Sequence, residues 1–61
     1  MPLFEVELKY TLTDSTLTST RLIECAQVSG AVEAAQSIIQ KDLGITIQPT
    51  WVHVYAKNTD L

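Results

Sequence analysis

The stretch FEVELKYTL, residues 4–12, alternates apolar and polar residues without a break. A period of two is the spacing of a β-strand, whose successive side chains point to opposite faces of the sheet. We therefore predict a strand from Phe4 to Leu12 whose apolar side is buried, with Glu5, Glu7 and Lys9 on the other side. The fold is expected to form around this strand.

A second strand is predicted after a short turn. Thr13, Asp14 and Ser15 are polar residues that stabilise turns through bonds to their own backbone, so a β-hairpin is expected. The following run, residues 16–28, begins rich in Thr and Ser and becomes apolar. Leu22 and Ile23 are adjacent and cannot share a face, which means that both faces are partly covered or that a bulge shifts the register. We favour Ile23 and Cys25 on the side of the helix.

The segment from about residue 30 to 43 is predicted to be a helix. Ser29 or Gly30 provides an N-cap, the sequence between is rich in Ala, and Gly44 is suited to a left-handed C-cap. The apolar residues fall at helical spacing, which predicts a single buried stripe. That stripe comprises Val32, Ala35, Ile39 and Leu43, with Ile38 beside them.

The last strand is predicted from Thr50 to Lys57, because Pro49 cannot donate to a sheet ladder and interrupts the apolar run before it. Residues 58–61 are expected to be a flexible tail. Together the elements predict one α+β domain over residues 1–61, of order ββαβ, with a three-stranded, mainly antiparallel sheet and one helix on one face. Strand order 2-1-3 is preferred because it gives the regular first strand the central place, and 1-2-3 is the alternative.

We expect this domain to be a homodimer, because 61 residues bury only a small core. Cys25 is the single cysteine and His53 the single histidine, so neither an intrachain disulfide nor a four-ligand zinc site is available. With 46% hydrophobic residues the chain is of the globular class. Oligomerisation is the remaining common source of stability for a domain of this size.

The composition also restricts the environment and the partners that we expect. The first residues do not resemble a signal peptide and no apolar run has the length of a membrane span, so a cytoplasmic location is expected, or the host cytoplasm if the protein is viral. The formal net charge is −3 and the few basic residues are scattered. Duplex nucleic acid is therefore disfavoured as a partner, because its binding depends on neutralising phosphates.

The candidate interaction surface lies on the last strand, where Trp51, His53 and Tyr55 alternate with Val52 and Val54. If the valines face the helix, the aromatic side chains lie on the open side of the sheet. A subunit interface is the favoured interpretation, and a stacking platform for single-stranded nucleic acid is the second. The third interpretation places the aromatic residues in the core beneath the helix. The predicted interface or ligand face comprises Trp51, His53, Tyr55, Glu5, Glu7, Lys9 and Arg21.

No catalytic, cofactor-binding or metal-binding residue is predicted. Cys25 and His53 would have to be in contact to act as a nucleophile and base, and they are expected on opposite sides of the sheet. Glu5 and Glu7 lack the cleft that carboxylate catalysis needs. We expect a small non-enzymatic accessory protein, an inhibitor or adaptor of the kind found in phages and plasmids, that binds another protein. The alternative is a binder of single-stranded nucleic acid with Lys9 and Arg21 on the phosphates.

Overall fold

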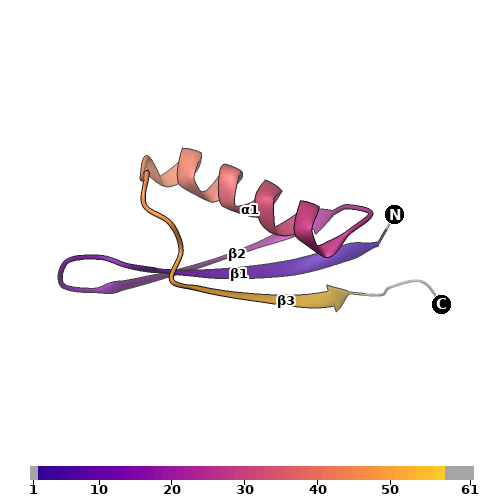
Figure 1. Ribbon diagram of the computed structural model, residues 1–61, viewed down its shortest axis with the longest axis horizontal. Coiled ribbons are helices and arrows are strands. Elements are labelled where there is room, and N and C mark those ends of the chain that lie inside the picture. Colours follow the sequence, from indigo (N-terminus) through magenta and orange to yellow (C-terminus); the bar gives the residue numbers. More distant parts are fainter. Residues whose placement is uncertain (1, 58–61) are drawn as a thin grey trace.

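The computed structural model describes residues 2–57. The fold consists of three antiparallel strands, in the order β2-β1-β3, and one helix (Figure 1). The elements are β1 (Leu3–Thr11), β2 (Thr16–Glu24), α1 (Val28–Leu43) and β3 (Trp51–Lys57). The predicted α+β class and the strand order 2-1-3 are confirmed. The expectation of a flexible tail concerns residues 58–61, which lie outside the described residues.

The β1–β2 hairpin runs in continuous register from Leu3 opposite Glu24 to Thr11 opposite Thr16. No bulge interrupts this ladder, so Leu22 and Ile23 lie on opposite faces of the sheet. Leu22 is 60% exposed, whereas Ile23 is buried as predicted. The sheet therefore has a face packed against α1, here called the helix face, and an uncovered face, here called the open face.

The core lies between α1 and the helix face, and its centre is the apolar row of β1. Alternation buries every second residue of that strand, and three helix residues and one residue of β2 complete the cluster. The buried residues are Phe4, Val6, Leu8, Tyr10, Ile23, Ala31, Ala35 and Ile39.

The helix begins earlier than the sequence indicates, and β2 ends earlier. Gln27, in extended conformation, precedes the first helical residue and caps the helix without a side-chain hydrogen bond. Ser29 and Gly30 consequently belong to the first turn, and β2 stops at Glu24 rather than at Val28. The predicted end is confirmed, because Gly44 adopts the left-handed conformation with φ of 66°.

The buried stripe of α1 is rotated relative to the prediction. Ala31, Ala35 and Ile39 face the sheet, whereas Leu43 and Ile38 are more than two-fifths exposed. The cause is that α1 packs mainly against β2 and β1 and only lightly against β3. The small alanine side chains allow the helix to approach these two strands closely, and the helix side of β3 remains partly uncovered.

The molecule is elongated, with principal extents of 43 × 16 × 16 Å, and the turn of the β1–β2 hairpin projects beyond the end of the helix (Figure 1). Within residues 2–57, α1 has neither the length nor the apolar character that crossing a bilayer requires.

Candidate functional site

A row of three aromatic rings runs along β3 on the open face. Trp51, His53 and Tyr55 lie opposite Lys9, Glu7 and Glu5 of β1, and all three rings are exposed. The ring centroids of Trp51 and His53 are 5.3 Å apart, and those of His53 and Tyr55 are 4.2 Å apart in an edge-to-face arrangement. These three residues, called the aromatic row below, are brought together as the sequence predicts.

Charged side chains of β1 border the aromatic row. Lys9 places its Nζ atom 4.6 Å from the centroid of the Trp51 ring, a cation–π contact. At the other end of the row, Lys57 Nζ lies 3.4 Å from Glu5 Oε1. The open face therefore carries both signs of charge, and one of its two lysines is already paired with a carboxylate.

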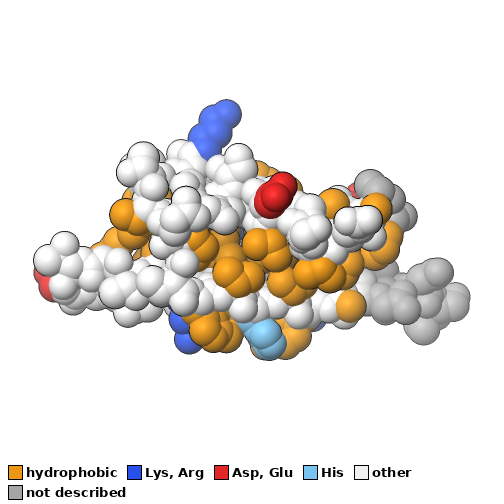
Figure 2. Space-filling model, viewed as in Figure 1, with side chains coloured by type: hydrophobic (Ala, Val, Ile, Leu, Met, Phe, Trp, Pro, Cys, Tyr) orange, Lys and Arg blue, Asp and Glu red, His pale blue; other side chains and the backbone are white. Residues whose placement is uncertain are grey.

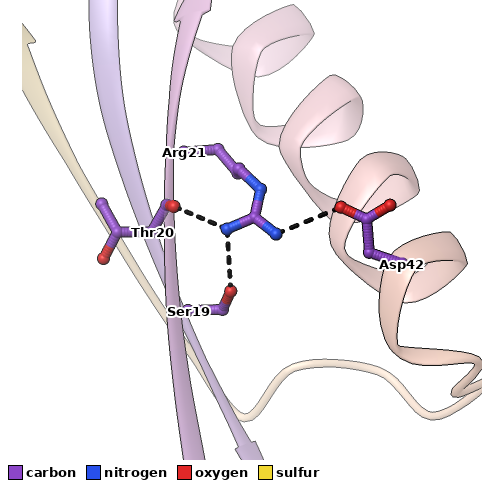
Figure 3. Close-up of polar contacts among 4 residues, drawn as sticks. All are labelled: Ser19, Thr20, Arg21 and Asp42. Atoms are coloured by element: carbon purple, nitrogen blue, oxygen red, sulfur yellow. Dashed lines mark hydrogen bonds and ion pairs between the residues drawn. The ribbon is translucent and has the colours of Figure 1, made fainter.

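Arg21 does not belong to this surface. It lies opposite Val6, on the helix face, and its guanidinium group contacts Asp42 of α1 at 3.2 Å (Figure 3). The same group donates to the backbone oxygen of Thr20 and to the hydroxyl of Ser19. The prediction that grouped Arg21 with the open face is therefore wrong, because the register of the hairpin puts Arg21 on the same face of β2 as Ile23.

The helix side of β3 forms a second exposed apolar surface. Val52 is 42% exposed although it faces α1, and Val54 and Ala56 are also incompletely covered. Hydrophobic side chains gather between α1 and β3 in the space-filling view (Figure 2). Exposed apolar side chains thus occupy both sides of one strand.

The alternation of hydrogen bonds in the sheet determines which backbone groups of β3 point away from β1. Leu12 N donates to Ser15 O and Cys25 N donates to Pro2 O, so the even-numbered residues of β1 bond to β2. The odd-numbered residues of β1 consequently bond to β3, as the bond from Thr50 N to Lys9 O shows. On β3 the backbone groups of the aromatic row therefore point to β1, and those of Val52, Val54 and Ala56 point outward.

The arrangement does not assemble the catalytic pair considered above. Cys25 packs against the core beneath α1, whereas His53 is exposed on the open face. Among residues 2–57, no group of three or more His, Cys, Asp or Glu side chains is placed to hold a metal ion.

Sequence reasoning missed the exposure of Val52 and the outward backbone groups of β3. The signal was present in part, because Val52-His53-Val54-Tyr55-Ala56 has no charged residue and no proline. The sequence does not specify where the helix lies across the sheet, and this position determines how much of β3 is covered.

Comparison with known proteins adds no assignment: no protein-family model, no curated protein and no solved structure gives a significant match to the chain.

Proposed function

We propose that this protein is a non-enzymatic accessory protein that forms a homodimer and binds another macromolecule, as an inhibitor or adaptor. The observation that carries the proposal is the aromatic row, exposed on a sheet face that no element among residues 2–57 covers. We place its action in the cytoplasm, or in that of a host cell if the protein is viral.

The exposed side chains are of the type that stabilises protein contacts. Trp51 and Tyr55 are 40% and 46% exposed, and Trp and Tyr combine a large apolar area with a polar end. Such residues are frequent among those whose truncation costs most in binding energy. Leu22 adds an aliphatic side chain on the same face, at the position opposite Glu5. Together they support a protein partner.

A second candidate function is the binding of single-stranded nucleic acid, and one observation favours it. The contact between Lys9 and Trp51 places a cation beside an exposed ring, the combination that holds a phosphate next to a stacked base. Against it, Lys57 is paired with Glu5 and Arg21 is on the other face. Only Lys9 then remains beside the row without a carboxylate partner among the described residues, which is little charge for a phosphate backbone.

Two measurements test the proposal. Light scattering at micromolar concentration should give twice the 6.8 kDa of one chain, and a well-folded monomer would contradict the homodimer. Titration with an unstructured oligonucleotide at low salt should leave Trp51 fluorescence unchanged. Quenching that disappears at high salt would instead establish the second candidate, because stacking on Trp51 quenches its emission and phosphate contacts are weakened by salt.

A further inference from the structure

We propose that the outer edge of β3 pairs with β3 of a second copy, antiparallel and with Val54 opposite Val54 of the second copy. The two three-stranded sheets then form one continuous sheet of six strands. This inference rests on the proposed homodimer and deepens it by naming the surface through which the two copies associate.

The two edges of the sheet differ in how they are protected from pairing. On β2 the Thr20 backbone oxygen points outward, by the same alternation, and the Arg21 guanidinium group already occupies it (Figure 3). Arg21 itself is a charged residue on the inner side of an edge strand, and natural proteins use such residues to prevent strand addition. The outer edge of β2 is therefore blocked at its middle.

The edge of β3 has none of these protections within residues 51–57. Its ladder with β1 has no bulge, its interior has no proline, and its single charged residue, Lys57, is the last of the strand. Three residues, Val52, Val54 and Ala56, direct their N–H and C=O groups away from β1. A long apolar edge of this kind is a template for another strand.

The register follows from these outward groups. Hydrogen-bonded pairs in an antiparallel ladder exchange two bonds each, so only outward-pointing residues can pair in this way. When the twofold axis passes through the Val54 pair, Val52 lies opposite Ala56 of the second copy, and Ala56 lies opposite Val52 of the second copy. All three outward residues of each copy are then used, giving three pairs and, at two bonds a pair, six hydrogen bonds. A shift by two residues in either direction leaves one outward residue of each strand without such a pair.

The side chains on the open face are complementary in this register. Trp51 lies opposite Lys57 of the second copy, which repeats the pairing of Trp51 with Lys9 across the β1–β3 ladder. His53 lies opposite Tyr55 of the second copy, which repeats the contact between these rings along β3. No like charges meet across the new ladder, and directly opposed pairs of this kind stabilise sheets. The strand is thus complementary to itself, which a twofold interface requires.

Hydrogen exchange of the unmodified protein tests the pairing directly. The amide protons of Val52, Val54 and Ala56 should exchange at least tenfold more slowly than the outward amides of β2, which include Thr20 and Leu22. Both sets belong to edge strands, so without pairing all of these amides would exchange at comparable fast rates. Equal rates in the two sets would overturn the proposal.

Disulfide trapping tests the register. In a Cys25→Ala background, Val54→Cys should form a covalent dimer under mild oxidation, because hydrogen-bonded partners have Cα atoms about 5.5 Å apart, within the range of a disulfide. The matched variant is Val52→Cys, which lies on the same face of the same strand. Its two copies would be four residues apart along the ladder, about 14 Å, and should not be bridged. Equal bridging of both variants would contradict the register.

The outcomes separate this inference from the proposed function. A monomer by light scattering would overturn both. A dimer whose Val52, Val54 and Ala56 amides exchange fast, and whose Val54→Cys variant is not bridged, would overturn the β3 pairing alone and leave the homodimer standing. A dimer with slow outward amides and a selective Val54→Cys bridge would support both.

Discussion

Gly30 and Cys25 provide a sharp test of how the start of α1 is packed. A Cβ atom added to Gly30 would lie 2.6 Å from Cys25 Sγ, closer than non-bonded carbon and sulfur atoms approach. The thiol packs against the core, so Gly30→Ala must displace it from that contact. The substitution therefore combines a local gain in helix propensity with a steric penalty between two segments.

The magnitudes decide the sign of the effect. Replacing Gly by Ala within a helix gains up to about 1 kcal/mol, whereas overpacking costs about 1–3 kcal/mol. We expect Gly30→Ala to lower the free energy of unfolding by about 1 kcal/mol when Cys25 is present. In a Cys25→Ala background the sulfur atom is gone, and the same substitution should raise stability by up to about 1 kcal/mol. The expected coupling between the two positions is about 2 kcal/mol.

Urea unfolding of the four proteins, followed by circular dichroism at one protein concentration, measures this coupling. A common concentration is needed because the proposed dimerisation would make the apparent stability depend on protein concentration. Gly44→Ala is the matched control: Gly44 has φ of 66° and no atom near an added Cβ, so its cost should be equal in both backgrounds. Additive effects of Gly30→Ala and Cys25→Ala, or a stabilising Gly30→Ala with Cys25 present, would refute the reasoning.

Three further predictions concern buried and paired groups. Tyr10 is fully buried and its hydroxyl has no hydrogen-bond partner among the described residues, so Tyr10→Phe should stabilise the fold by about 1 kcal/mol in urea unfolding. The matched change Tyr55→Phe, at an exposed position, should not stabilise it. Burial raises the pKa of Tyr10 above 10.0, so as pH rises the Tyr10 hydroxyl loses its proton in the unfolded chain before it does so in the folded chain. The free energy of unfolding should therefore fall as pH rises beyond 10.0, and this fall should be less steep in Tyr10→Phe. Asp42→Asn should cost under about 1 kcal/mol, and less in 1 M salt, because its ion pair with Arg21 is exposed.

The sheet was predictable because its signal is local. Uninterrupted alternation over residues 4–12 specifies which side of β1 is buried, and the regularity of this strand led to its central place in the order 2-1-3. The same alternation placed the aromatic row opposite Glu5, Glu7 and Lys9, as the register shows.

Two parts of the prediction, the face of Arg21 and the buried stripe of α1, were wrong for different reasons. Arg21 was misplaced although Ile23 and Cys25 were expected on the helix side. Alternate residues of a strand share a face, so that expectation already puts Arg21 on the helix side, where the register has it. The buried stripe of α1 was misjudged because Ala31 has a smaller side chain than Val32, and hydrophobicity favours the larger residue. Close approach of the helix to β2 reverses that preference. The second error concerns how closely the helix approaches the sheet.

The difference between the two sheet edges explains why association would stop at two copies. If both edges were open, β3 of one molecule could add to β2 of the next, and this head-to-tail contact would continue into a filament. The Arg21 guanidinium on Thr20 blocks the middle of the β2 edge, which favours pairing through β3. When β3 of one copy pairs with β3 of the other, the free β3 edge of each copy is covered, and the assembly is closed at two copies. In the proposed dimer, the ion pair with Asp42 would act mainly by holding Arg21 at the β2 edge, because an exposed pair of this kind adds little to the stability of the fold.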